Sequence, residues 1–229
     1  MPKKKAPQSR ALVPVGEAKT YPIATTEIEA TQLFHVPARH PRGPGPWEHE
    51  VDKIAWIDAA TGLACTILRQ PDGVLGGYVG VGEDHPLFGF EKDAVPGALG
   101  ISPHGGLDYA ATCKRGPEET SVCHPGELPR PPLQRPPRDD VGANLAHHPL
   151  WWFGFECRKD CDLVPGDITR NDLGGEIGRV YRDEAYVYTQ TCILARQLTA
   201  VEQGKRDDGS EFDPSNPSQP VVVPREPRS

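Results

Sequence analysis

The chain has 229 residues, enough for one domain of ordinary size with additional tails. Its formal net charge of -7 argues against a broad positive surface for nucleic-acid binding. No run of about 20 apolar residues is present, so no transmembrane helix is expected. The 26 prolines and 24 glycines predict that much of the chain is loop or tail.

Residues 1–43 are expected to form a disordered N-terminal arm, of which only Ile23 to Phe34 has apolar spacing and could dock on the domain. Residues 40–46 are rich in proline and glycine and cannot hold a helix or a central strand. The basic run from Lys3 to Lys5 is a solvated tail, a nuclear address or a nucleic-acid contact. No signal-peptide h-region is recognisable, so we expect a cytoplasmic protein whose six cysteines are reduced thiols.

A single ordered domain is expected over residues 44–204, and it begins with a hairpin. Residues 53–58 and 63–69 are rich in strand-forming side chains. The segment between them, residues 59–62, contains a glycine and reads as a turn.

A third strand is expected at residues 74–81, after the turn Pro71-Asp72-Gly73. Proline fixes φ in that turn and glycine allows positive φ, so the three strands should form an antiparallel meander. Gly76, Gly77 and Gly80 weaken a strand unless they serve packing. They indicate a bulge, or a place where another backbone or a ligand comes close.

Two more strands are expected, at residues 101–111 and 150–156. The first is interrupted near its start by His104 and two glycines, and the second is nearly continuous in apolar residues, which suits burial on both faces. Between them, residues 114–143 form a Pro/Arg-rich loop. Its segment from Pro131 to Pro137 is either plain exposed loop or a polyproline II segment that a protein partner reads.

One helix is expected at residues 182–203, where apolar side chains recur at spacings of three and four. Asp183 and Glu184 suit its first turn, and Gly204 suits its C-terminal end. Residues 205–229 are expected to be a disordered tail. The elements together predict an α+β fold, in which a small antiparallel sheet packs against one C-terminal helix between disordered terminal arms.

Cys123, His148, Cys157 and Cys161 are the candidate metal ligands. Zinc takes four thiolate or imidazole ligands in a tetrahedron, and Cys157 and Cys161 form a pair with three intervening residues. The overall spacing matches no standard zinc finger. The alternatives are buried or idle thiols, or a disulfide joining Cys157 to Cys161 or Cys113 to Cys123. Zinc is therefore a candidate cofactor whose presence the sequence leaves open.

His104, Glu156 and Asp162 are the candidate catalytic residues. An imidazole beside a carboxylate can act as general acid and base near neutral pH. We expect His104 to be exposed at a tight turn, and Glu156 to emerge at the rim of the sheet. Such a group could run hydrolysis or deamination, although no nucleophile elbow, zincin helix or phosphate loop accompanies it. The alternative is that each histidine is a hydrogen-bonded structural residue.

Tyr78, Tyr109, Trp151 and Trp152 are the candidate binding residues. Aromatic side chains near glycine can stack on a base or a sugar. The alternative is that they form the core, because a domain with few leucines and isoleucines must draw buried area from its aromatic residues.

Several motifs occur together, and in this order, in an uncharacterised group of actinobacterial and phage proteins. The chain resembles that group from about Trp47 to Val201. The motifs are Asp52-Lys53 through Trp56, Thr61-Gly62-Leu63-Ala64-Cys65, Gly77-Tyr78-Val79-Gly80-Val81 with His85-Pro86, His104-Gly105-Gly106-Leu107, Cys123-His124-Pro125 and Trp151-Trp152-Phe153-Gly154-Phe155-Glu156-Cys157.

Members of the group tend to read Asp-Cys-Ala-His after the Trp-Trp-Phe-Gly-Phe run. This chain has Glu156, Cys157, Arg158 and Lys159 there, so the histidine is missing. The resemblance implies a shared domain and a phage-linked origin, without an assigned reaction.

Two functional classes stay open. The first is a non-catalytic accessory or binding protein of phage or prophage type, favoured by the arms, the Pro-rich loop and the missing histidine. The second is a small hydrolase-like enzyme that uses His104 with Glu156 or Asp162, with or without zinc. It is favoured by polar residues gathered at the ends of Gly-containing strands.

Overall fold

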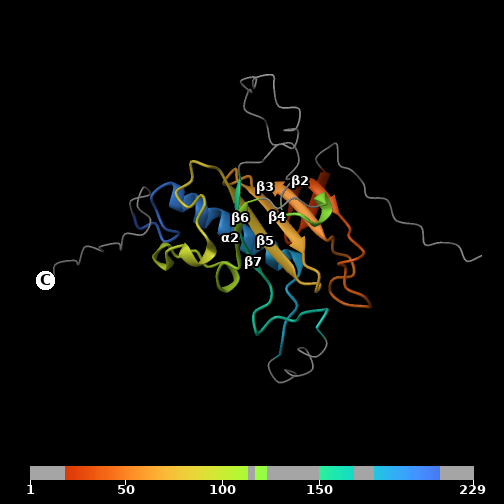
Figure 1. Ribbon diagram of the computed structural model, residues 1–229. Coiled ribbons are helices and arrows are strands. Elements are labelled where there is room, and N and C mark those ends of the chain that lie inside the picture. The colour runs from red at the N-terminus through yellow and green to blue at the C-terminus, as the bar shows by residue number, and fades with distance from the viewer. Residues whose placement is uncertain (1–18, 113–116, 123–149, 168–177, 212–229) are drawn as a thin grey trace, which may run out of the picture.

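The computed structural model describes residues 19–112, 117–122, 150–167 and 178–211 (Figure 1). Its seven strands form one antiparallel sheet in the order β1-β2-β3-β4-β5-β7-β6. The strands are β1 (Lys19–Ile23), β2 (Thr26–Phe34), β3 (Lys53–Ile57), β4 (Ala64–Arg69), β5 (Leu75–Val81), β6 (Tyr109–Thr112) and β7 (Trp151–Glu156). Among the described residues one long helix, α2 (Glu184–Glu202), crosses one face of the sheet and packs mainly on β4 and β5. The predicted α+β fold is confirmed.

The centre of the sheet is buried on both faces, because successive side chains of a strand point alternately into two apolar layers. The helix face carries the main core, in which Ile67, Val79 and Phe155 pack with helix residues such as Leu194 and Leu198. The opposite face carries a smaller cluster, which consists of Ala64, Leu68, Tyr78 and Trp152 with Ile57, Tyr109, Val122 and Leu150 packed around them. Strands β4 and β5 are buried along their whole length for this reason.

The expectation of a disordered arm up to residue 43 is wrong over its described part. Residues 19–34 form β1 and β2, which pair with each other and then with β3. In β2 the side chains of Ile28, Ala30, Gln32 and Phe34 are buried at alternate positions, the pattern of a half-buried strand. The exposed positions of this strand hold Thr26, Glu27 and Glu29, so the overall composition of the segment resembled that of a loop. Residues 1–18 lie outside the described residues.

The C-terminal boundary and the sixth strand also need correction. Residues 205–211 are ordered around a turn, in which Lys205 bridges to Glu211 and the Arg206 Nε donates to the Ala98 carbonyl. The rest of the expected tail, residues 212–229, lies outside the described residues. The strand expected at 101–111 is shorter, because residues 103–105 form a 3-10 turn and pairing begins at Tyr109.

The Pro/Arg-rich loop is described only at residues 117–122, where a short 3-10 turn spans Glu118–Thr120. Residues 113–116 and 123–149, which include Pro131 to Pro137, lie outside the described residues. In the described part of the chain, no helix has the length and apolar content that crossing a membrane requires.

Gly77 allows α2 to lie close to the sheet. A Cβ at this position would lie 2.1 Å from the Thr191 Oγ1 and 2.7 Å from the Phe155 ring. The strand pairs with its neighbours in regular register, so the glycines of β5 mark a close approach rather than a bulge. Across the sheet, a Cβ at Gly154 would meet the Tyr78 ring at 2.2 Å in the same way.

Candidate functional site

His104 and Asp162 are brought together, as one form of the sequence hypothesis required. The His104 Nε2 lies 2.6 Å from the Asp162 Oδ2, and the His104 Nδ1 lies 2.9 Å from the Tyr186 hydroxyl. The His104 side chain is only 4% exposed and that of Asp162 is 0% exposed. His104 is therefore buried rather than exposed at its turn, and both of its ring nitrogens have partners.

The backbone of His104 is in the left-handed region, with φ 41° and ψ 42°, which is unusual for a residue with a side chain. The following glycines, Gly105 and Gly106, also have positive φ and complete the turn. The Gln190 side chain of α2 accepts a hydrogen bond from the His104 N–H at 2.8 Å. The helix therefore fixes both the backbone and, through Tyr186, the ring of this histidine.

Asp162 is the acceptor at the centre of this cluster. Its Oδ1 accepts from the Arg182 Nε at 2.8 Å, and its Oδ2 also accepts from the Lys159 N–H at 2.8 Å. Burial acts to raise the pKa of Asp162, but the hydrogen bonds from His104, Arg182 and Lys159 outweigh it and hold that pKa below its ordinary value. The carboxylate is thus anionic at neutral pH. An anionic carboxylate can only accept, so Nε2 carries the proton of that hydrogen bond, and in a neutral ring Nδ1 is then the acceptor for the Tyr186 hydroxyl.

Glu156 does not join His104, contrary to the other form of the hypothesis. Its carboxylate accepts from the Tyr78 hydroxyl at 3.2 Å and pairs with the Arg158 Nε at 3.0 Å, on the sheet face away from α2. The His104 ring instead packs against Phe155, whose side chain faces the helix. Successive residues of a strand point to opposite faces, so Glu156 and Phe155 cannot serve the same site.

Three of the four predicted aromatic binding residues do come together. Tyr78 and Tyr109 stack edge to face with ring centroids 5.4 Å apart, and Trp152 belongs to the same small cluster. Trp151 faces the other way, and its Nε1 donates to the Phe90 carbonyl at 3.0 Å. Tyr78 is 1% exposed and Trp152 is 0% exposed, so these rings form core rather than a surface on which a ligand can stack.

The predicted cysteine-rich metal site is only partly within the described residues. Cys123 and His148 lie outside them. Cys157 is a buried free thiol, and burial raises its pKa, whereas Cys161 is an exposed free thiol. The Cys161 Sγ lies 3.8 Å from the Asp162 Oδ1. Because both thiols are free, the alternative disulfide between Cys157 and Cys161 is not formed.

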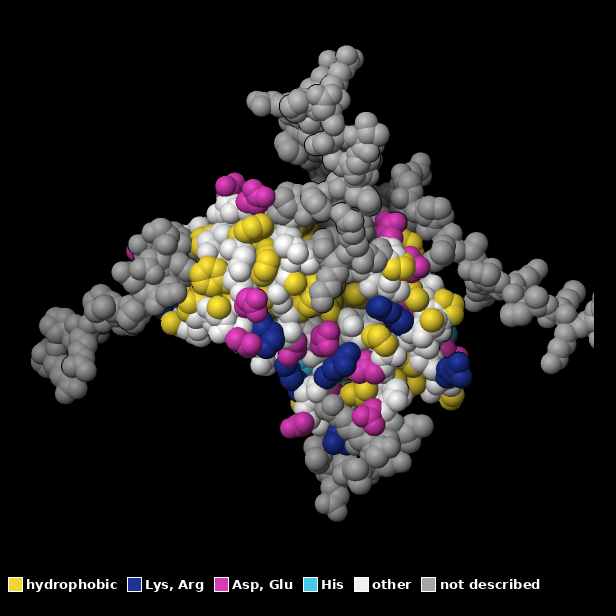
Figure 2. All heavy atoms as spheres, viewed as in Figure 1, with side chains coloured by type: hydrophobic (Ala, Val, Ile, Leu, Met, Phe, Trp, Pro, Cys, Tyr) yellow, Lys and Arg dark blue, Asp and Glu magenta, His cyan; other side chains and the backbone are white. Residues whose placement is uncertain are grey.

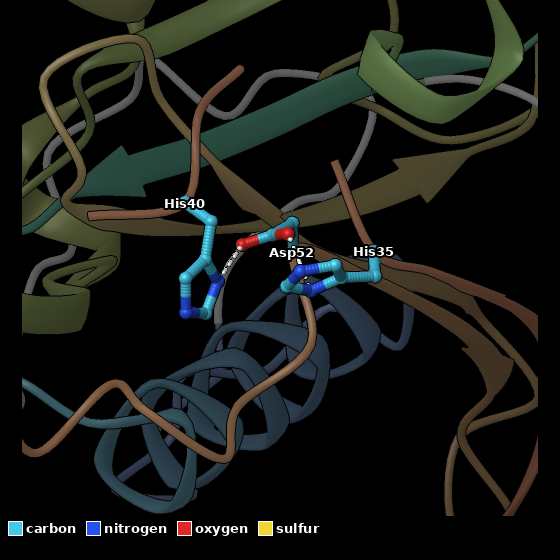
Figure 3. A group of neighbouring side chains, drawn as sticks. All are labelled: His35, His40 and Asp52. Atoms are coloured by element: carbon cyan, nitrogen blue, oxygen red, sulfur yellow. Dashed lines mark hydrogen bonds and ion pairs between the residues drawn. The ribbon is translucent and has the colours of Figure 1, made fainter. Parts of the chain in front are cut away.

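A second polar cluster, which the sequence hypotheses did not include, joins His35, His40 and Asp52 (Figure 3). The His35 Nδ1 lies 3.0 Å from the Asp52 Oδ2, and the His40 Nδ1 lies 2.9 Å from the Asp52 Oδ1. The three ligand atoms lie within 4.8 Å of one another. In the part of the chain that the structure describes, this is the one group of three such side chains spaced closely enough to hold a metal ion.

Local structure places these three residues. His35 directly follows β2, and a tight turn, in which the Val36 carbonyl accepts from the N–H groups of Arg39 and His40, returns the second imidazole. Asp52 directly precedes β3, and its N–H donates to the Phe34 carbonyl at 2.8 Å. The end of one strand and the start of its neighbour thus bring both imidazoles to one carboxylate.

Arg69 fixes the Asp52 carboxylate from behind. The guanidinium is 0% exposed, and its Nε lies 2.6 Å from the Asp52 Oδ1 while its NH2 lies 2.7 Å from the Glu50 Oε2. Burial acts to lower the pKa of Arg69, but the contacts with Tyr181 and Glu50 outweigh burial and hold that pKa above its ordinary value. The Val36 N–H donates to the Asp52 Oδ2 at 2.6 Å.

The sequence carried a weak signal for this cluster. The histidines stand five residues apart beside a proline, and Asp52 opens the first motif of the resemblance. Assigning residues 1–43 to a disordered arm removed both histidines from consideration.

No family model matches the chain, and no match is found among the curated proteins or the solved structures.

Proposed function

We propose that the protein is a non-catalytic binding protein, of the accessory type encoded by phages and prophages. The closed hydrogen bonding of His104 carries this proposal. A general base must reach the proton it abstracts. Here one ring nitrogen contacts Asp162, the other contacts Tyr186, and the side chain is 4% exposed. The hydrogen-bonded pair of His104 and Asp162 is therefore suited to stabilising the fold.

The cluster joins segments that are far apart in the chain. His104 comes from a turn before β6, and Asp162 follows β7. Arg182 lies just before α2, and Tyr186 lies in its first turn. A non-glycine residue held in the left-handed region costs roughly 1–3 kcal/mol. The hydrogen bonds to Gln190, Tyr186 and Asp162 offset that cost, and such strain is kept only where the surroundings require the conformation.

The partner is proposed to be a protein that contacts the Pro/Arg-rich segment 114–143. Both described flanks of residues 123–149 are fixed to the sheet face away from α2, where Val122 and Leu150 pack on the aromatic cluster. The Lys53 Nζ also donates to the Glu118 carbonyl at 2.6 Å. These contacts fix the described residues on either side of the segment to one face of the sheet.

Charge and cysteine chemistry support the rest of the proposal. On the described surface in Figure 2, Lys and Arg side chains are interspersed with Asp and Glu, which disfavours broad nucleic-acid binding. The four cysteines among the described residues are free thiols, which suits a cytoplasmic location.

The alternative is a hydrolase-like enzyme in which His104 and Asp162 act through Tyr186. The half-buried Tyr186 hydroxyl, bonded to the His104 Nδ1, is the observation that favours it. Burial raises the pKa of Tyr186, so the phenolate is disfavoured and this arrangement is a poor nucleophile at neutral pH.

The two functions separate in one pair of measurements on His104→Ala. As a structural residue, His104 should contribute about 2 kcal/mol, the usual value for hydrogen bonds to charged groups, so urea unfolding should shift clearly. Hydrolysis of p-nitrophenyl acetate and p-nitrophenyl phosphate should be the same for the wild type and the variant. A wild-type rate that disappears in a variant of unchanged stability would establish the enzyme instead.

The binding part is tested by deleting residues 128–143. The wild-type chain and the deletion variant are immobilised and exposed to host lysate, and retained proteins are identified by mass spectrometry. A protein held by the wild type and not by the variant supports the proposal, provided that both chains unfold at the same temperature. Equal retention by both chains removes this segment from the partner surface.

A further inference from the structure

We propose that His35, His40 and Asp52 bind a divalent transition-metal ion of the zinc class, with two imidazoles and one carboxylate as ligands. This site is separate from the His104 cluster and goes beyond the proposed binding function. Two imidazoles with one carboxylate form a donor set that suits zinc and its neighbours in the transition series.

The separation of each imidazole nitrogen from the Asp52 carboxylate is compatible with a shared ion. With nitrogen and oxygen ligands about 2.1 Å from the metal, two ligands separated by roughly 90–110° lie about 3.0–3.4 Å apart. The two imidazole nitrogens lie 3.0 Å and 2.9 Å from the Asp52 oxygens. Figure 3 shows the two rings on either side of the carboxylate, each directing Nδ1 toward it.

The carboxylate has acceptor positions left for an ion. An ionised carboxylate offers about four lone-pair sites. The Val36 N–H and the Arg69 Nε occupy one site on each oxygen, at 2.6 Å in both cases. The remaining site on each oxygen faces an imidazole nitrogen, so an ion would take the place of the two ring N–H donors. Each neutral ring would then carry its proton on Nε2.

The outer contacts have the form of a supported metal site. Hydrogen bonds that orient a ligating carboxylate are a regular part of such sites. Arg69 holds Asp52, and Glu50 in turn accepts from Arg69 and from the Tyr181 hydroxyl at 2.6 Å. The ligand is therefore positioned before an ion arrives, which reduces the cost of binding.

The local charge does not exclude a cation. Arg69 is paired with both Asp52 and Glu50. Arg39 is the second guanidinium nearby, and it donates to the Arg69 carbonyl at 2.8 Å rather than to Asp52. The two carboxylates therefore balance the two guanidinium groups when the imidazoles are neutral.

Access is open on the imidazole side. The His35 side chain is 44% exposed and that of His40 is 15% exposed, whereas Asp52 is 0% exposed. An ion would therefore contact the buried carboxylate on one side and the partly exposed imidazoles on the other. Its remaining coordination positions would face solvent, as in zinc sites with three protein ligands and water.

The test is calorimetric titration of the full chain with zinc chloride under reducing conditions. The wild type should bind one ion at this site, and His35→Ala and His40→Ala should each weaken the affinity by about 100-fold or more, since even outer-shell changes cost 10–100-fold. His49→Ala is the matched control, because His49 is an exposed histidine outside the cluster and its loss should change nothing. Zinc should raise the unfolding temperature of the wild type and the control, but not of the His35→Ala chain.

Cobalt(II) spectroscopy separates this site from the cysteines. Nitrogen and oxygen ligands give d–d bands without a thiolate charge-transfer band, and that spectrum should be lost in His35→Ala. A thiolate band from the bound ion, zinc affinity that survives both histidine substitutions, or a wild type that binds no zinc below millimolar concentration would each overturn the proposal.

Discussion

Arg69 is a cation with no solvent exposure, and it is tolerated because every N–H group of its guanidinium has an acceptor. The Nε contacts Asp52, NH1 contacts the Gly73 carbonyl and the Tyr181 hydroxyl, and NH2 contacts Glu50 and the Val51 carbonyl. An unpaired charge in such a place costs several kcal/mol. The same network holds the Asp52 carboxylate that the two histidines approach.

The Asp162 carboxylate should make the stability of the protein depend on acid. Burial raises the pKa of Asp162, but hydrogen bonds from His104 and Arg182 outweigh it, so the folded pKa is below the ordinary 3.8. The stabilisation is therefore present above that ordinary value and is lost as pH falls through the folded pKa. Asp162→Asn should lower the free energy of unfolding at pH 7 by about 2 kcal/mol.

Urea unfolding measured from about pH 7 to about pH 2 checks this, since the variant should lose less stability than the wild type below about pH 4. Asp160→Asn is the control, because Asp160 is an exposed neighbour. Parallel curves for wild type and Asp162→Asn throughout the acid range would contradict the assignment.

The candidate residues differ in how far the sequence could locate them. His104 and Asp162 were recognisable because an imidazole beside glycines and a carboxylate after a strand are both typical of sites. The burial of His104 was not recognisable, since it depends on Tyr186 and Gln190 of a helix more than 80 positions later in the chain. Glu156 was misplaced because the sequence alone did not orient the faces of β7.

Among the elements, the meander β3-β4-β5 and the helix α2 follow from local signals. Turn residues separate the strands, and the helix begins after the Asp183 cap, whose side chain accepts from the Tyr186 N–H at 2.8 Å. The β1-β2 hairpin carries weaker signals. Its turn contains Ala24 at φ 53°, a conformation for which glycine is the usual residue, so the sequence gives no clear turn signal there. Its buried positions include Ala30 and Gln32, which are weak signals of a core strand.

Gly77→Ala should weaken the contact between β5 and α2. The added methyl would overlap the Thr191 Oγ1, so the helix would have to shift, and overpacking of this kind costs about 1–3 kcal/mol. Gly82→Ala is the matched control, because a Cβ there would meet no atom within 4 Å. Thermal unfolding of the two variants checks this, and equal melting temperatures would show that the helix moves at little cost.

For the whole molecule, the position of the N-terminal hairpin decides where the domain begins. Ile23, Ile28 and Ala30 belong to the main core, and β2 covers the edge of β3. A chain truncated to residues 44–229 should therefore lose its cooperative unfolding transition and aggregate through the uncovered strand. A chain of residues 17–229 keeps the hairpin and should behave like the full protein.

Size-exclusion chromatography and circular dichroism compare the two truncations. A monomeric 44–229 fragment with the melting temperature of the full chain would show that the β1-β2 hairpin does not contribute to the stability of the domain. The domain would then begin at residue 44, as the composition predicts.

The strand order has a consequence for how the protein folds and varies. Strands β1 to β4 each pair with the next strand in sequence, whereas β5 pairs with β7. The edge strand β6 also pairs only with β7, from which residues 113–150 separate it in the chain. Contacts between sequence neighbours form early, and distant ones form after the entropy of loop closure has been overcome. That entropy grows only with the logarithm of length, so doubling the connection costs about 0.6 kcal/mol. The β6–β7 connection is therefore the place where evolution, or an engineer, can insert new sequence at the smallest thermodynamic cost.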